Sequence, residues 1–173
     1  MTRERFLALA GVSVLPFWGC AASVTEPEPG HGGLADAELR KTLAEWRALL
    51  SAEAFGVLFE ERTEAPGSSP LNGEQRVGTF VCAACFVPLF LSPLKYDSGT
   101  GWPTFSAPIE ERLGFKLDLA LGTPRTEYHC RRCGGHQGHV FDDGPPPTGK
   151  RYCNNGLALR FVPQGEPLPE LRT

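Results

Sequence analysis

The sequence has no excess of positive charge. Its 17 lysines and arginines are outnumbered by 20 aspartates and glutamates, and the net charge at pH 7 is −3. A protein that binds duplex nucleic acid through the phosphates is expected to carry a basic face. We therefore expect no nucleic-acid partner. The chain also lacks an internal repeat, and its 173 residues suffice for one domain with a sizeable core.

The N-terminal apolar run is too short for a stable membrane anchor. It extends from Phe6 to Trp18 and follows Arg3 and Arg5. A short apolar run after basic residues is typical of the hydrophobic region of a signal peptide. We predict that residues 1–20 are a signal peptide and that the protein is exported, as a bacterial periplasmic or membrane-anchored protein.

The end of this run resembles a lipobox, in which Cys20 after Gly19 would be lipidated and become the mature N-terminus. Phe17 stands where such motifs usually carry leucine. Ordinary cleavage and a twin-arginine-like route therefore stay open beside a lipid anchor on Cys20. Residues 21–35 are rich in proline, glycine and glutamate and are predicted to form a flexible tether.

Apolar residues recur at helical spacing after the tether, at Leu39, Leu43, Trp46 and Leu50. This pattern predicts a helix with Asp36 as its N-cap.

Ser51 is predicted to cap a second short helix, which presents Phe55, Leu58 and Phe59 and ends before Pro66. We expect both helices to pack on a core and assign them no chemistry.

The sequence pattern changes from Val77 onward, where short apolar runs alternate with clusters of glycine, proline and aspartate. Such runs are typical of strands joined by turns. The fold is therefore predicted to be mostly β, an antiparallel core with short N-terminal helices in a domain of residues 36–165. Residues 166–173 are expected to form an irregular tail. The predicted strands cover residues 78–81, 87–91, 115–119, 139–141 and 157–162.

Four of the six cysteines form two CxxC pairs, Cys82-Ala-Ala-Cys85 and Cys130-Arg-Arg-Cys133. Two such pairs can hold one Zn²⁺ tetrahedrally, at Zn–S distances of about 2.3 Å. Disulfides or a redox CxxC motif are the alternatives in an oxidising compartment. Each pair lies among glycine and proline turns and not at the start of a helix, which favours structural zinc. A site closed by four thiolates leaves the chemistry to other residues.

Cys153 is the candidate for that chemistry. An unpaired cysteine is by default a small buried apolar residue. Arg151 lies two residues earlier, on the same side of a strand, and can favour the thiolate. Asn154 and Asn155 follow, and one of them could bind a polar ligand. Both interpretations of Cys153, buried residue and nucleophile, stay open on this evidence.

Three segments together resemble one family, the B-type methionine sulfoxide reductases, which act on the R epimer at sulfur. The resemblance extends over residues 43–162 and includes both cysteine pairs of the zinc-containing members. It implies a core of two small, barrel-like sheets. The segments are KYDSGTGWPTF at residues 95–105, HQGHVFDDG at residues 136–144 and RYCNN at residues 151–155.

The resemblance implies that the Cys153 thiolate attacks the sulfoxide sulfur of methionine sulfoxide in oxidised proteins or peptides and is left as a sulfenic acid. His136 and His139 match the active-site histidines and would deliver protons to the departing oxygen. Each could instead be a structural histidine.

The remaining site residues are also assigned by the resemblance. Trp102 would form a wall for the substrate methyl group, with Phe105 assigned to substrate binding beside it, although Trp102 could also belong to the core. Asn155 matches the asparagine beside the catalytic cysteine. Arg151 and Asp143 match a charged pair in which Asp143 orients Arg151 or a histidine, or serves only as a turn residue.

The sequence departs from the family at Thr100, where many members carry a second, resolving cysteine. Three recycling routes remain: attack by a thioredoxin-like or small-thiol reductant, resolution by Cys20, or use of a zinc-ligand thiol. Direct reduction is the route that we expect.

Asn154 is a further departure, because relatives often carry an apolar residue there. Two rival functions are weighed beside sulfoxide reduction, a non-catalytic zinc-binding interaction module and a thiol redox sensor or peroxidase.

Overall fold

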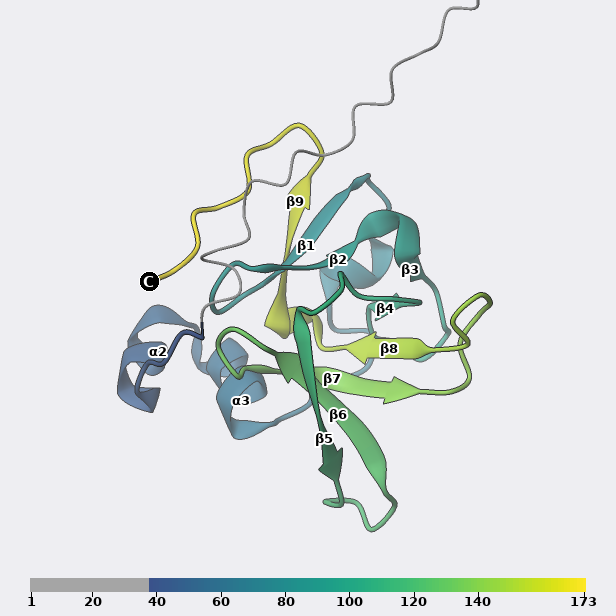
Figure 1. Ribbon diagram of the computed structural model, residues 1–173, viewed down its shortest axis with the longest axis horizontal. Helices are drawn as coiled ribbons and strands as arrows, with labels where there is room; N and C mark the ends of the chain where they lie inside the picture. The colour runs from purple at the N-terminus through teal and green to yellow at the C-terminus, as the bar shows by residue number, and fades with distance from the viewer. Residues whose placement is uncertain (1–37) are drawn as a thin grey trace, which may run out of the picture. The chain divides into compact units, whose positions relative to one another are not determined.

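A computed structural model describes residues 38–173, so the predicted signal peptide, the tether and Asp36 lie outside the described residues. The described chain folds as two antiparallel sheets with two short α-helices beside them (Figure 1). The prediction of a mostly β fold is confirmed. Within residues 38–173, no helix has the length and apolar character needed to cross a membrane.

Helix α2 (Leu43–Leu49) begins later than predicted. Thr42 and Glu45 form a capping box, in which each side chain binds the backbone N–H of the other residue. Because this box fixes the helix start, Leu39 lies before the helix, where its N–H donates to the carbonyl oxygen of Arg132 at 2.6 Å. The prediction that Leu39 is helical was therefore wrong.

Helix α3 (Ala52–Glu60) follows at once, and its predicted cap is confirmed. The Ser51 hydroxyl accepts from the N–H of Ala54 at 3.1 Å. Phe55 and Leu58 are almost completely buried and pack into the core.

The smaller sheet has the strand order β2-β1-β9. Its strands are β1 (Gly78–Cys82), β2 (Pro88–Leu91) and β9 (Leu159–Pro163). The strand that was predicted to start at residue 157 starts at Leu159, because Gly156–Ala158 forms a 3-10 turn.

The larger sheet has six strands in the order β3-β4-β8-β7-β6-β5. Its strands are β3 (Lys95–Tyr96), β4 (Thr104–Phe105), β5 (Leu113–Asp118), β6 (Arg125–Cys130), β7 (His136–Phe141) and β8 (Arg151–Asn154). Two further 3-10 turns lie outside the sheets, at Pro70–Gly73 and Ser92–Leu94.

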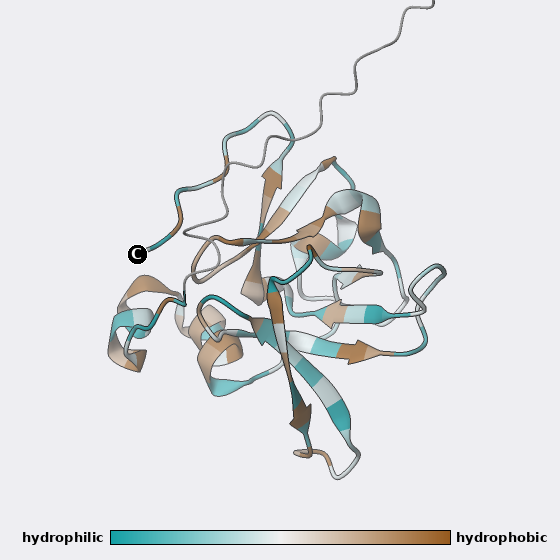
Figure 2. Cartoon of the chain, viewed as in Figure 1, coloured by the Kyte–Doolittle hydropathy of each residue, from teal (hydrophilic) through white to brown (hydrophobic). Residues whose placement is uncertain are grey.

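Strand β6 was missing from the predicted strands. Its sequence, RTEYHC, has no apolar run, and much of its ribbon is hydrophilic in Figure 2. Tyr128 and Cys130 are nevertheless fully buried, while Glu127 faces the other side of the sheet.

Strand alternation also decides where Phe105 lies. Cross-strand pairing places Thr104 opposite Cys153 and Phe105 opposite Tyr152. Because successive side chains point to opposite faces of a sheet, Phe105 points into the core, where its ring stacks on Phe90 with centroids 4.2 Å apart. It is fully buried. The structure thus places Phe105 in the core and not at a substrate-binding surface.

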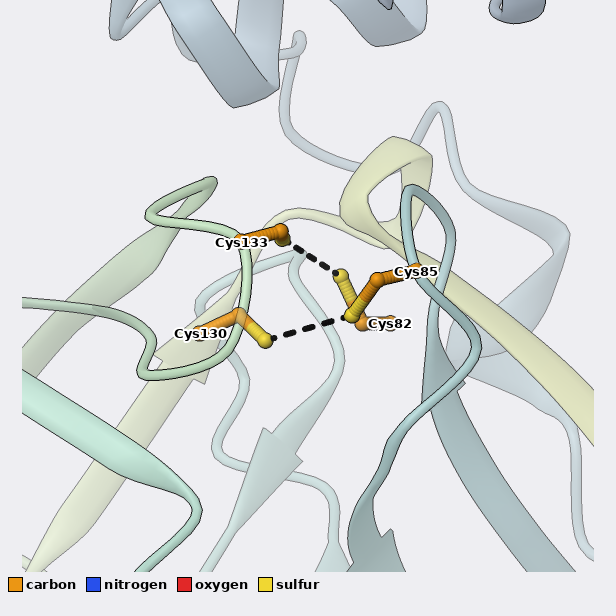
Figure 3. Close-up of side chains that lie close together, drawn as sticks. All are labelled: Cys82, Cys85, Cys130 and Cys133. Carbon is orange, nitrogen blue, oxygen red and sulfur yellow. Dashed lines mark hydrogen bonds between the residues drawn. The ribbon is translucent and has the colours of Figure 1, made fainter. Parts of the chain in front are cut away.

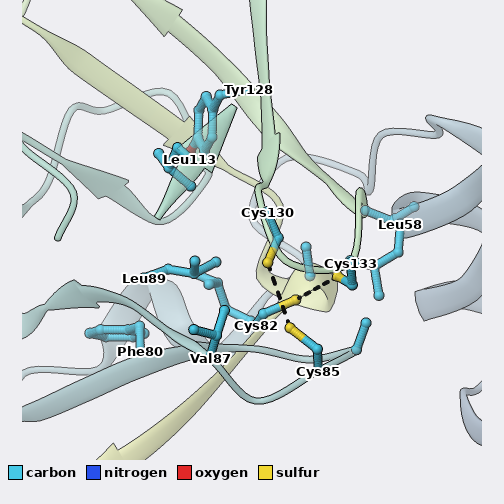
Figure 4. Packing of buried hydrophobic residues seen from close by; sticks show 14 of the residues in the cluster. Leu58, Phe80, Cys82, Cys85, Val87, Leu89, Leu113, Tyr128, Cys130 and Cys133 are labelled. Atoms are coloured by element: carbon cyan, nitrogen blue, oxygen red, sulfur yellow. Dashed lines mark hydrogen bonds between the residues drawn. The ribbon is translucent and has the colours of Figure 1, made fainter. Parts of the chain in front are cut away.

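The core lies between the sheets and α3 (Figure 4). Aromatic and aliphatic side chains such as Phe80, Leu89 and Tyr128 fill it, and all three are fully buried. The two cysteine pairs lie at one side of this core, beside Leu58 and Val87.

Candidate active site and metal cluster

Two turns bring the four paired cysteines together. One turn joins β1 to β2 and the other joins β6 to β7, and their sulfur atoms face one another in Figure 3. All four sulfurs lie within 4.8 Å of each other. The separations are 3.7 Å between Cys82 and Cys133 and 3.6 Å between Cys85 and Cys130.

These distances fit a metal site and not disulfides. A tetrahedron of sulfurs about 2.3 Å from one ion has edges of about 3.8 Å, whereas a disulfide needs an S–S distance of about 2.05 Å. Burial and the neighbouring sulfurs raise the pKa of Cys82 well above its ordinary value. Hydrogen bonds from the neighbouring sulfurs lower the pKa of Cys85. Four buried thiolates would nevertheless repel each other, so all four can ionise together only around a cation. The chain therefore has a closed, four-cysteine metal-binding cluster.

The two turns share one backbone geometry. In each, the residue after the second cysteine adopts a left-handed conformation, at Phe86 (φ 66°) and Gly134 (φ 74°). Its N–H donates to the carbonyl oxygen of the first cysteine, from Phe86 to Cys82 and from Gly134 to Cys130. The Arg172 guanidinium in the C-terminal tail lies 4.4 Å above the Phe86 ring and covers that turn.

Cys153 lies on β8 in a row of paired residues that crosses the larger sheet. His139 is its partner on β7, and Thr104 is its partner on β4. The row continues from His139 to Glu127 on β6. Paired residues have side chains on the same face, so the sulfur, the imidazole and the carboxylate share one side of the sheet. The full row is Tyr96, Thr104, Cys153, His139, Glu127 and Lys116.

A pocket opens above this row. Trp102, His139, Cys153 and Asn155 line it, so the structure brings together four of the predicted site residues. Its other lining residues are Thr63, Arg125, Gly138, Phe141 and Asn154.

Burial disfavours the thiolate of Cys153. It raises the pKa of the thiol above its ordinary value, although contacts with the Thr100 hydroxyl and the Arg151 guanidinium lower it in part. Because a thiol must ionise to act as a nucleophile, the site needs donors close to this sulfur.

His139 is held by a carboxylate. Its Nε2 lies 2.8 Å from an oxygen of Asp118, which also binds Arg125. Burial lowers the pKa of His139, and the Asp118 carboxylate opposes this effect. The pKa of Asp118 is itself lowered by the N–H of Ala120 and by His139, so Asp118 is an anion. Nδ1 is therefore the nitrogen of His139 that can exchange a proton with a ligand.

His136 lies behind His139 and does not line the pocket. The two rings are 5.6 Å apart at an angle of 65°. His136 is buried, and its Nδ1 lies 3.0 Å from the Glu127 carboxylate. Burial raises the pKa of Glu127, but His136 and Lys116 outweigh burial and lower it. The position of His136 suits a residue that supports His139 more than one that touches a ligand.

Arg151 and Asp143 form a two-pronged ion pair, with N···O distances of 2.7 and 2.9 Å. The guanidinium also lies 4.2 Å above the ring of Phe141. Asp143 is exposed and does not line the pocket. The pair holds Arg151 on the Cys153 face of β8, where its charge lowers the pKa of that thiol.

Glu64 connects Trp102 to the segment after Cys153. Its carbonyl oxygen accepts from the Trp102 indole at 3.1 Å, and its N–H donates to the Asn155 side chain at 3.1 Å. Its buried carboxylate accepts from the N–H groups of Gly156 and Leu157. Both sides of the pocket are thereby fixed to one residue.

The two asparagines after Cys153 serve the protein interior. The amide of Asn155 is shared between the N–H of Glu64 and the carbonyl oxygen of Gln137. Asn154 is fully buried, and its side-chain oxygen accepts from the Tyr128 hydroxyl at 2.8 Å. The departure at Asn154 therefore adds a buried hydrogen bond to Tyr128 beneath the pocket that Asn154 helps to line.

Sequence reasoning missed Glu64 and the carboxylates behind the histidines. One signal was present: in residues 115–119, Lys116 and Asp118 alternate with exposed apolar side chains. Alternating charges in a strand point to one polar face. Nothing in the sequence indicated which strand that face would meet.

The fold and the site define a β protein with a four-cysteine cluster that could hold a metal and a separate pocket lined by Cys153. Comparison with known proteins gives the family. A SelR domain matches residues 50–163. The chain is 48% identical over 128 residues to the peptide methionine sulfoxide reductase MsrB of Pseudomonas putida (strain W619). These aligned residues cover 73% of this chain and 96% of that protein. It is 44% identical over 131 residues to the protein of the same name from Agrobacterium fabrum, and these residues cover 75% of this chain and 97% of that protein.

The chain therefore belongs to the SelR-domain family of B-type methionine sulfoxide reductases. The resemblance in the three sequence segments is confirmed.

Proposed function

We propose that the protein reduces peptide-bound methionine-R-sulfoxide to methionine and so repairs oxidised proteins. The observation that carries this proposal is the pocket that Cys153 lines together with Trp102 and with His139, its partner across the sheet. A thioether methyl group packs well against an aromatic ring, and such a contact contributes about 0.3–1.5 kcal/mol. Trp102 thus gives the pocket a wall suited to the S-methyl group.

The reaction is a transfer of one oxygen atom between two sulfurs. The Cys153 thiolate attacks the sulfoxide sulfur, and the oxygen takes a proton from His139. The hydroxyl then passes to the Cys153 sulfur as its bond to the substrate sulfur breaks, so that methionine leaves and Cys153 becomes a sulfenic acid. Two electrons pass from Cys153 to the substrate. Two equivalents of an external thiol then return Cys153 to the thiol, with release of water and a disulfide.

Replacement of the nucleophile tests the proposal. Cys153→Ser should lower the reduction of a methionine-R-sulfoxide peptide by dithiothreitol about 10³-fold or more, while the protein keeps its fold and its metal. Wild-type activity in this variant would contradict the proposal. Peroxide consumption by the wild type that outpaces sulfoxide reduction would favour a thiol peroxidase or redox sensor. No turnover by folded wild-type protein would favour a non-catalytic binding module.

The pH dependence tests the role of His139. Burial raises the pKa of Cys153 and lowers that of His139, so thiolate and imidazolium coexist in a small fraction of molecules. Between the two pKa values, the thiolate fraction rises tenfold per pH unit while the imidazolium fraction falls tenfold. Because the reaction needs both forms, the product of the two fractions stays constant, and kcat/KM should not change with pH in this range. In His139→Gln, kcat/KM should be lower and should rise through that range about tenfold per pH unit. A plateau that persists in this variant would exclude His139 as the acid.

We infer that the four-cysteine cluster holds structural Zn²⁺. Its support is the tetrahedral spacing of the sulfurs and the preference of Zn²⁺ for thiolates. Metal analysis should give one zinc per chain, and a strong chelator should lower Tm by about 10 °C or more, because metal binding contributes directly to folding. Cys133→Ser should lose the metal, and Cys153→Ser is the matched control that keeps it. Full stability of the metal-free protein would contradict a structural role.

We also propose export through residues 1–20 and recycling by an external thioredoxin-like or small thiol. Thr100, which cannot form a disulfide, supports this route, since its hydroxyl lies 4.0 Å from the Cys153 sulfur where many relatives place the resolving cysteine. The intact mass of the protein from its own cells should show loss of the leader, and an acyl mass would identify Cys20 as a lipid anchor. A mass equal to the full unprocessed chain would contradict export.

A further inference from the structure

Three hydroxyl groups form an unbroken chain that starts at the Cys153 sulfur. Thr100 Oγ1 lies 4.0 Å from that sulfur. Ser98 Oγ is 2.8 Å from Thr100 Oγ1 and 2.9 Å from Thr104 Oγ1. The chain ends at the backbone of Trp102, whose carbonyl oxygen accepts from the Thr104 hydroxyl at 2.9 Å.

Each hydroxyl carries one proton, so the direction of one bond fixes the direction of the others. When Thr104 donates to the Trp102 carbonyl, Ser98 donates to Thr104 and Thr100 donates to Ser98. The oxygen of Thr100 is then free to accept from the S–H group of Cys153. In the opposite direction, Thr104 turns away from the Trp102 carbonyl oxygen, which gives up that hydrogen bond, and donates to Ser98. Ser98 then donates to Thr100, and Thr100 donates to the sulfur.

We propose that Thr100 is a catalytic hydrogen-bond donor to the Cys153 thiolate and that Ser98 and Thr104 are positioning residues that orient it. On ionisation the S–H bond breaks and its proton leaves the sulfur for solvent or substrate. The three hydroxyl protons rotate, and no other covalent bond changes. Thr100 thus supports the thiolate from the position where many relatives carry a resolving cysteine. This inference rests on the proposed function of Cys153 as the nucleophile.

The charges around Cys153 explain why a neutral donor matters there. Burial raises the pKa of the thiol, and the Thr100 hydroxyl and the Arg151 guanidinium both lower it. Arg151 is paired with Asp143, whose negative charge acts in the opposite direction. A hydroxyl that donates to a charged acceptor stabilises it without bringing a counterion. Fully buried Thr104 keeps the far end of the chain away from water.

The test measures how readily Cys153 ionises, without any sulfoxide. The rate at which iodoacetamide alkylates Cys153 in the reduced, zinc-loaded full chain is followed from pH 5 to 10 by mass spectrometry of the peptide. Thr100→Val, which keeps the shape and removes the hydroxyl, should slow alkylation near neutral pH about tenfold and move its midpoint to higher pH. Thr100→Ser should restore the wild-type profile. Ser98→Ala should shift the profile in the same direction by less.

Thr126→Val is the matched control, because Thr126 is exposed on β6 and pairs with Leu117 on the face opposite Cys153. It should leave the alkylation profile unchanged. A wild-type profile in Thr100→Val would overturn the donor role of Thr100. A wild-type profile in Ser98→Ala alone would overturn the positioning role of Ser98. Failure of the reductase proposal would appear as absent turnover of the sulfoxide peptide with normal alkylation of Cys153, so the two failures are distinguishable.

Discussion

The pairing of β7 with β8 is the contact on which the rest of the site depends. It places His139 directly across from Cys153. The two backbones approach so closely that a Cβ on Gly138 would lie 1.9 Å from the carbonyl oxygen of Cys153, so only glycine fits there. A slip of one residue would turn the imidazole to the core face of the sheet. The chemistry of the pocket is therefore set by a backbone register.

Two separate devices hold that register. The metal cluster fixes the start of β7, because Cys133 lies three residues before it and the Gln137 amide reaches the Cys82 sulfur at 3.5 Å. The carbonyl oxygen of Gln137 in turn accepts from the backbone and side chain of Asn155. Glu64 holds the same segment from the other side through the N–H groups that follow Asn155. The four-cysteine cluster is thus connected to the pocket through hydrogen bonds, although none of its cysteines lines the pocket.

Most local features of the sequence were predicted well, although the Thr42–Glu45 capping box that starts α2 was missed. Features that depend on a distant partner were not predicted. The Ser51 cap and the CxxC pairs depend on a few adjacent residues, and both lie where they were predicted. Strand β6 is polar because Glu127 faces the site, so it lacks the apolar run by which strands are recognised. The side of the sheet on which Phe105 lies follows from its pairing with Tyr152 on β8. This pairing cannot be predicted from the sequence of β4 alone.

The charges of the site are balanced pair by pair. Arg151 is bound to Asp143, and Asp118 is shared by Arg125 and His139. No strong positive field therefore offsets the burial of Cys153 among the described residues, and each tenfold loss of thiolate corresponds to about 1.4 kcal/mol. Burial disfavours the imidazolium of His139 as well. The resting site is then a neutral thiol beside a neutral imidazole, which suits oxygen transfer: thiol and sulfoxide become sulfenic acid and thioether with no proton gained or lost.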